Sequence, residues 1–103
     1  MSLLYVDDMR TCPAGWKLAR TITEAIELLA TEEFELVSLD HDIEYHTTVK
    51  FGKENVPVVV ESPENFEAVA RYIALMPEDL RPEVRYHTAN PDGERSMREI
   101  LDD

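Results

Sequence analysis

Two short apolar segments of this sequence each end in carboxylates. The four acidic residues at these ends are Asp7, Asp8, Asp40 and Asp42. Gathered on one rim, four carboxylates would repel one another and raise one another's pKa, unless a cation or basic groups compensate. Oxygen ligands of this kind suit Mg²⁺ best, with Mn²⁺ or Ca²⁺ as alternatives. The pattern predicts a metal site, and the competing interpretation is that these carboxylates only cap turns and accept hydrogen bonds.

Histidines accompany these carboxylates. His41 lies between Asp40 and Asp42, and His87 ends another short segment. Imidazole is the side chain that exchanges protons most readily near neutral pH, and a neighbouring carboxylate can orient it. We therefore predict acid–base roles for His41 and His87, against the alternative that both histidines are structural.

Candidate phosphate-binding groups stand next to both features. Thr88, Asn90 and Gly93 belong to a turn that opens a predicted helix, where free backbone N–H groups and the helix dipole favour an anion. Arg10 follows the first acidic pair and could contact a phosphate or the carboxylates. A plain helix cap explains the turn equally well, and Arg95, in the first helical turn, is a weaker candidate.

Parallel strands would bring these residues together. Residues 3–6 and 36–39 are continuous apolar runs, typical of central strands buried on both faces, whereas residues 16–20 and 84–87 alternate as edge strands do. The predicted fold is an α/β domain with an open, mainly parallel sheet of about four strands in the order 2-1-3-4. The direction of the second strand stays open, because the loop before it is short for a crossover. Ligands bind such sheets beyond the strand ends, where the order reverses, between the two central strands.

Helix signals separate the predicted strands. A capping-box pattern at Thr21 predicts a helix that runs to about residue 31, with apolar residues at steps of three and four. Ser62-Pro63 predicts the start of a second helix, and Asn90-Pro91 the start of a third. The irregular segment 44–62 is predicted as a β-hairpin insertion.

Length and charge narrow the function classes. A chain of 103 residues fits one domain, 1–103, with one core. The formal net charge of −12 repels polyanions and argues against an extended nucleic-acid surface, but a small phosphate ligand remains compatible with it. No targeting pattern and no apolar run near the roughly 18 residues of a membrane helix is present, which predicts a cytoplasmic domain without a membrane partner. Cys12, the only cysteine, is expected to be an ordinary loop residue.

Taken together, the motifs resemble the receiver domains of two-component response regulators, which have a flavodoxin-like fold. The resemblance is closest to a divergent branch, the cyclic-phosphate-processing receiver-like domains. The matching segments are Leu4-Tyr5-Val6-Asp7-Asp8-Met9-Arg10, Gly15-Trp16, Ser38-Leu39-Asp40-His41-Asp42 and His87-Thr88-Ala89-Asn90-Pro91-Asp92-Gly93. In receivers an acidic pair and a phosphate-accepting Asp hold Mg²⁺, and a Ser or Thr after the fourth strand contacts the phosphoryl group. By position these are Asp7, Asp8, Asp40 and Thr88.

The first hypothesis is a metal-dependent phosphoesterase that acts on a cyclic phosphate of a nucleotide or an RNA end. Its expected metal ligands, for Mg²⁺ or Mn²⁺, are Asp7, Asp8 and Asp40. Its expected catalytic residues are His41, His87 and Asp42, and its expected phosphate contacts are Arg10, Thr88, Asn90 and Gly93.

Two other functions compete with the first. One is a non-catalytic pseudo-receiver that binds a nucleotide or a partner protein, with the strand at residues 56–60 offering an edge for a homodimer. The other is phospho-accepting signalling at Asp40. The resemblance favours it less, because the fifth strand and the phosphate-contacting Lys of ordinary receivers are not found after the last predicted helix.

Overall fold

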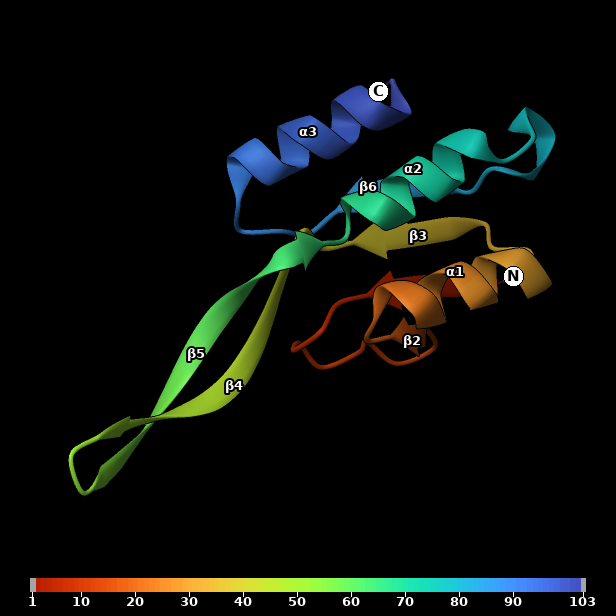
Figure 1. Ribbon diagram of the computed structural model, residues 1–103. Helices are drawn as coiled ribbons and strands as arrows, with labels where there is room; N and C mark the ends of the chain where they lie inside the picture. Colours follow the sequence, from red (N-terminus) through yellow and green to blue (C-terminus); the bar gives the residue numbers. More distant parts are fainter. Residues whose placement is uncertain (1, 103) are drawn as a thin grey trace.

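Four short parallel strands form the main sheet, in the order β2-β1-β3-β6 (Figure 1). The computed structural model describes residues 2–102, apart from the side chains of residues 45 and 46. The strands are β1 (Leu3–Val6), β2 (Lys17–Ala19), β3 (Leu36–Leu39) and β6 (Glu83–Tyr86). This confirms the predicted sheet and its order, with β6 as the fourth strand of the sheet.

The second strand runs parallel to the first, although no helix connects them. The loop between them is held by Arg20, whose guanidinium donates to the backbone oxygens of Asp7, at 3.2 Å, and Arg10, at 2.7 Å. Gly15 turns the loop back toward β2 with a φ of 86°, in the left-handed region where glycine carries no steric penalty. The loop itself therefore makes the crossover that the sequence left open.

Three helices follow the strands. They are α1 (Ile22–Thr31), α2 (Glu67–Leu75) and α3 (Pro91–Leu101), and a short 3₁₀ turn, η1 (Glu78–Leu80), follows α2. The Thr21 hydroxyl oxygen accepts from the Glu24 N–H at 3.0 Å, and Asn90 Oδ1 accepts from the Gly93 N–H at 3.0 Å. These caps start α1 and α3 where the sequence predicts them. None of the described helices has the length and apolar character that a membrane span requires.

The predicted start of the second helix at Ser62-Pro63 is wrong. Both residues lie in a strand, β5 (Glu54–Asn65), and α2 begins at Glu67. The Ser62 hydroxyl does accept from a nearby N–H, that of Glu64 at 3.1 Å, but this turn is local and no helix follows it. The side chain of Phe66 is fully buried and anchors the chain in the core. The helix therefore begins only after this residue.

All three helices pack on one face of the sheet. The core on this face combines alternate strand residues, Leu4 and Val37 among them, with Leu29 of α1, Ile73 of α2 and Met97 of α3. The strand residues between these, such as Tyr5 and Ser38, point to the opposite face, because successive side chains of a strand alternate. Leu36 and Ser38 are only half-buried there, so the expectation that β3 is buried on both faces is wrong. The reason is that all three helices cover the other face.

A long β-hairpin projects from the domain beside the carboxyl ends of the sheet strands (Figure 1). Its strands are β4 (Asp42–Phe51) and β5, joined at Gly52 and Lys53. The hairpin is the predicted insertion, but it is longer than 44–62, since Asp42 already pairs with Asn65. We call this hairpin the arm.

Candidate functional site

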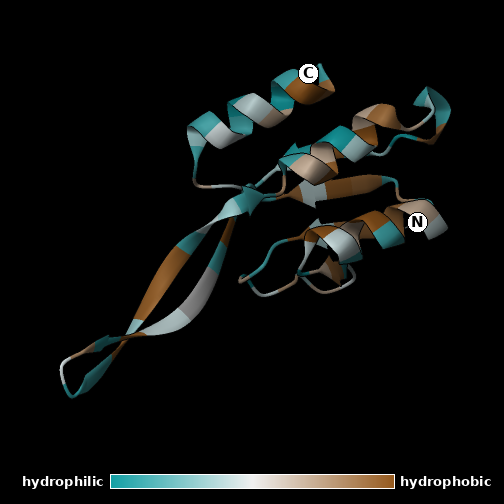
Figure 2. Cartoon of the chain, in the orientation of Figure 1, coloured by the Kyte–Doolittle hydropathy of each residue, from teal (hydrophilic) through white to brown (hydrophobic). Residues whose placement is uncertain are grey.

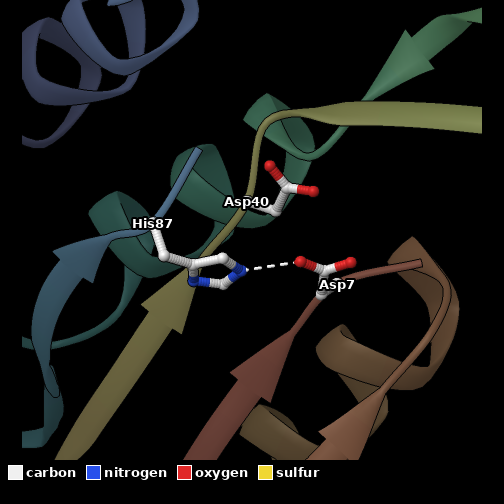
Figure 3. Close-up of side chains that lie close together, drawn as sticks. All are labelled: Asp7, Asp40 and His87. Carbon is white, nitrogen blue, oxygen red and sulfur yellow. Dashed lines mark hydrogen bonds and ion pairs between the residues drawn. The ribbon is translucent and has the colours of Figure 1, made fainter. Parts of the chain in front are cut away.

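Asp7, Asp40 and His87 meet at the carboxyl ends of β1, β3 and β6 (Figure 3). One ligand atom from each residue lies within 4.8 Å of the others. Asp7 is 1% exposed and Asp40 9% exposed, so two carboxylates are buried side by side. This is the place where the strand order reverses, and the sequence predicted it from the acidic strand ends.

Asp7 is held as a carboxylate by several donors. Its Oδ1 accepts the backbone N–H groups of Met9 and Arg10, each at 2.8 Å, and its Oδ2 lies 2.9 Å from His87 Nε2. Burial alone would raise the pKa of Asp7, but these hydrogen bonds outweigh it and lower the pKa below the usual value. Asp7 is therefore ionised at neutral pH, and its side chain acts as an acceptor.

The pKa of Asp40, in contrast, is raised. Burial raises its pKa, and the nearby charge of Asp7 raises it further, against the hydrogen bond that Asp40 Oδ1 accepts from the His41 N–H at 2.8 Å. Ionising both carboxylates is thus costly unless a cation lies between them. Within the described chain, Asp7 forms ion pairs with His87 and with Arg10, whose Nε is 3.8 Å from Asp7 Oδ2.

His87 is fixed on three sides. Its Nε2 faces Asp7, its Nδ1 lies 2.7 Å from the Ser38 hydroxyl oxygen, and its ring stacks on Tyr5 with centroids 4.4 Å apart and planes 7° from parallel. The sequence predicted His87 as a proton carrier. The structure places its Nε2 within 4.8 Å of a carboxylate oxygen of Asp7 and of Asp40.

Asp8 lies outside this three-residue group. Its Oδ2 accepts the Glu44 N–H of the arm at 2.7 Å, so its carboxylate ties the β1 loop to β4. Asp8 still lines the same pocket as Asp7 and Asp40. The structure thus brings together two of the three predicted metal ligands and adds His87 to them.

His41 is buried beside the pocket, between two carboxylates. Its Nδ1 donates to Asp42 Oδ1 at 2.7 Å and its Nε2 to Glu67 Oε2 at 2.6 Å. Both partners are acceptors, so both hydrogen bonds are made when both ring nitrogens carry hydrogen, as in the imidazolium. Burial alone would lower the pKa of His41, but the bonds to Asp42 and Glu67 raise it above 6.5. Glu67 was missed by the sequence analysis, because nothing in its local pattern links it to a residue 26 positions away.

Asp42 connects this buried histidine to the pocket. Burial would raise the pKa of Asp42, but hydrogen bonds from His41 and from Asn90 Nδ2, at 3.1 Å, lower it. Asp42 therefore presents a carboxylate at the pocket wall. Through these bonds, His41 joins the root of the arm to α2, and Asn90 joins it to α3.

The predicted phosphate contacts divide into two groups. Arg10 and Thr88 line the pocket, and the Arg10 guanidinium also donates to the backbone oxygen of His87. Asn90 and Gly93 do not line it, since the Asn90 side chain caps α3 and takes the Gly93 N–H for itself. The pocket has a volume of about 230 Å³ and is lined by Asp7, Asp8, Met9, Arg10, Asp40, Asp42, Glu44, Thr88 and Ala89.

The His41 clamp, formed by this ring with Asp42 and Glu67, predicts a pH dependence of stability. Because the folded pKa of His41 is raised, the stabilisation is fully present below pH 6.5 and is lost as the pH rises through the folded pKa. In urea denaturation with EDTA, we expect the free energy of unfolding to fall as the pH rises above 6.5 and through the folded pKa of His41. The Glu67→Gln variant should show a smaller fall, because the amide does not favour the imidazolium as the carboxylate does.

A matched control is Glu64→Gln, which removes an exposed carboxylate near the same end of β5. It should keep the parent's pH profile. The raised pKa of Asp40 also makes the free energy of unfolding fall as the pH rises. The difference between the Glu67 and Glu64 variants therefore isolates the part of the pH dependence that comes from His41. Equal profiles for parent and Glu67→Gln would contradict the clamp.

Comparison with known proteins identifies a family for this fold. Residues 2–103 match the family model of the cyclic-phosphate processing receiver domain. No curated protein and no solved structure matches the chain. The match covers the whole described chain, including the acidic strand ends and the turn before α3. With a parallel sheet in receiver order and carboxylates at its reversal point, the chain belongs to the cyclic-phosphate processing receiver domain family.

Proposed function

We propose that this domain is a metal-dependent phosphoesterase that opens a cyclic phosphate of a nucleotide or an RNA end. The observation that carries the proposal is the group of Asp7, Asp40 and His87, in which two buried carboxylates face an imidazole nitrogen at a pocket. The expected ion is Mg²⁺ or Mn²⁺. A pocket of about 230 Å³ has room for a phosphate group and part of a ribose, not for a long nucleic-acid segment.

The donor set fits a divalent cation. Mn²⁺ readily accepts both ligand types of this group, carboxylate oxygens and an imidazole nitrogen. Mg²⁺ prefers the carboxylate oxygens. Burial and the charge of Asp7 raise the pKa of Asp40, so a cation beside the pair would favour the ionised form of Asp40. An ion bound there would neutralise charge on the phosphoryl oxygens.

The pocket walls supply the other roles. The hydrogen bonds of Asp42 with His41 and Asn90 both use Oδ1, and we propose that its Oδ2 accepts a proton from the attacking water. Water adds to phosphorus, the bond from phosphorus to one ribose oxygen breaks, and that oxygen takes a proton from solvent. Arg10 and Thr88 would hold the phosphate oxygens.

Turnover of a 2′,3′-cyclic nucleotide tests this proposal. The protein should convert it to a nucleoside monophosphate with Mn²⁺ or Mg²⁺ and not with EDTA, as followed by phosphorus NMR. The decisive variant is Asp40→Asn, which should remove turnover. No product with either ion would overturn the proposal, and calorimetry showing nucleotide binding without product would favour a binding module instead.

We also propose a second candidate function, in which the arm binds a second copy of this chain. Val49 and Phe51 are 39% and 61% exposed, and they share one face of the arm with Val56 and Val58, as the strand register shows. Figure 2 shows this apolar stretch along β5. An isolated two-stranded hairpin is only marginally stable in water, so a cover for this face would stabilise it.

Charge indicates a second copy as that cover. Two of the three lysines of the chain, Lys50 and Lys53, are at the arm tip, whereas the net charge of the chain is −12. The tip of one copy therefore complements the acidic body of another.

We expect sedimentation velocity to show self-association that increases with protein concentration. Phe51→Ser should weaken it at least about tenfold, in line with loss of a large apolar contact at an interface. The control Leu75→Ser removes an apolar side chain that is 85% exposed at the end of α2, and it should leave self-association unchanged. A monomer at all accessible concentrations would contradict this role of the arm.

A further inference from the structure

Ser38 lies where a residue can control the orientation of His87. Its hydroxyl oxygen is 2.7 Å from His87 Nδ1, on the sheet face opposite the helices. In the register of the sheet, Ser38 is directly beside Tyr5 on β1 and beside Arg85 on β6, two residues before His87. The Tyr5 ring, stacked on the imidazole, limits rotation of His87 out of this plane. The ring is therefore held with Nδ1 toward Ser38 and Nε2 toward the carboxylates.

The hydrogen positions on His87 follow from its neighbours. Asp7 Oδ2, 2.9 Å from Nε2, belongs to a carboxylate whose other oxygen already accepts two backbone N–H groups. A carboxylate only accepts, so Nε2 must carry the hydrogen when no ion is bound. In a neutral ring Nδ1 is then an acceptor, and the Ser38 hydroxyl donates to it.

Coordination of an ion by His87 Nε2 would reverse these positions. A ring nitrogen coordinates through its lone pair, so Nε2 must lose its hydrogen when it faces an ion held by Asp7 and Asp40. The ring stays neutral if Nδ1 gains one hydrogen as Nε2 loses one, both exchanged with solvent. Nδ1 then donates, and the Ser38 oxygen must accept.

We propose that Ser38 is a positioning residue that keeps His87 Nε2 directed at the carboxylate pair in both hydrogen arrangements of the ring. A hydroxyl both donates and accepts, so Ser38 can partner Nδ1 before and after an ion binds. A carboxylate at this position would always demand a hydrogen on Nδ1, and an alanine would leave Nδ1 without its partner. The inference rests on the proposed metal site, but its statement about the ion-free ring does not.

Nitrogen NMR of the histidine rings tests the proposal directly. In the parent protein with EDTA, the neutral ring of His87 should carry its hydrogen on Nε2, and adding Zn²⁺ as a diamagnetic probe should move it to Nδ1. Ser38→Ala should weaken this preference and lower affinity for Mn²⁺ about 10–100-fold, the usual cost of losing a partner that orients a ligand. Ser38→Thr, which keeps a hydroxyl and suits a strand, should restore both.

The controls separate this inference from the proposed function. Ser62→Ala removes a hydroxyl on the arm and should change neither the ring signals nor the affinity. A neutral His87 ring with its hydrogen on Nδ1 in the ion-free parent, or unchanged ring signals and affinity in Ser38→Ala, would overturn the inference. If no ion binds while the ion-free ring behaves as expected and responds to Ser38→Ala, the positioning role stands and the metal-dependent function fails.

Discussion

Replacing Asp40 with asparagine should abolish metal binding without weakening the ion-free fold. The asparagine side chain has the shape of the aspartate side chain but no charge, so one of the two anionic ligands is lost. Losing a partner outside the ligand shell already costs about 10–100-fold in metal affinity, so losing a ligand should cost more than about 100-fold. Calorimetry with Mn²⁺ measures the affinity, and turnover of a 2′,3′-cyclic nucleotide should fall below detection with it.

Stability provides the second measurement on the same variant. The raised pKa of Asp40 means that its ionised form is disfavoured in the fold, and this cost appears as the pH rises through the folded pKa. The Asp40→Asn substitution removes the cost, so urea denaturation with EDTA near pH 7 should give a free energy of unfolding equal to or above the parent's. Loss of metal binding together with loss of folding would instead mean that Asp40 supports the structure.

Asp79→Asn is the matched control for this variant. Asp79 lies in η1 and is exposed, so its neutralisation changes the net charge equally but not the site. It should keep the parent's affinity and turnover. Asp40→Asn with the parent's affinity for Mn²⁺ would show that the ion is held elsewhere.

Gly93→Ala is expected to destabilise the fold strongly, although alanine is the better helix former. A Cβ at this position would lie 2.4 Å from His41 Cγ and 2.5 Å from its Nδ1. The ring cannot retreat easily, because Asp42 and Glu67 hold both of its nitrogens. Overpacking of this kind costs about 1–3 kcal/mol, or more where the neighbours are rigid, and outweighs the gain of up to about 1 kcal/mol in helix propensity.

A double-mutant cycle makes this prediction specific. His41→Ala alone should destabilise, since it removes the buried hydrogen bonds from the imidazole to the Asp42 and Glu67 carboxylates. In the His41→Ala background, Gly93→Ala should be neutral or stabilising, because the ring that it would strike is gone. Urea denaturation of the four proteins gives the coupling. Additive effects of the two substitutions would contradict the close contact of Gly93 with His41.

The locations of the acidic groups were predictable from sequence, because strand ends in a parallel sheet share one edge. Apolar runs at residues 3–6 and 36–39 predicted central strands, and the residues after them had to meet. The caps at Thr21 and Asn90 are local interactions, within three residues, and the sequence predicted both helix starts. Ser62 carries the same type of signal and failed, because strand pairing with β4 and burial of Phe66 outweigh a local turn.

The sequence by itself determined the sheet, its order and the edge at which carboxylates and histidines gather. Only the tertiary structure decided the partners of each side chain. Asp8 accepts a hydrogen bond from the backbone of Glu44, 36 residues away. His41 is hydrogen-bonded to Glu67, and His87 to Ser38 and Asp7. An imidazole therefore completes the group in which Asp8 was expected. The physical reason is range. Strand and helix signals act over a few residues, whereas each of these hydrogen bonds joins segments that meet only when the sheet and the arm have formed.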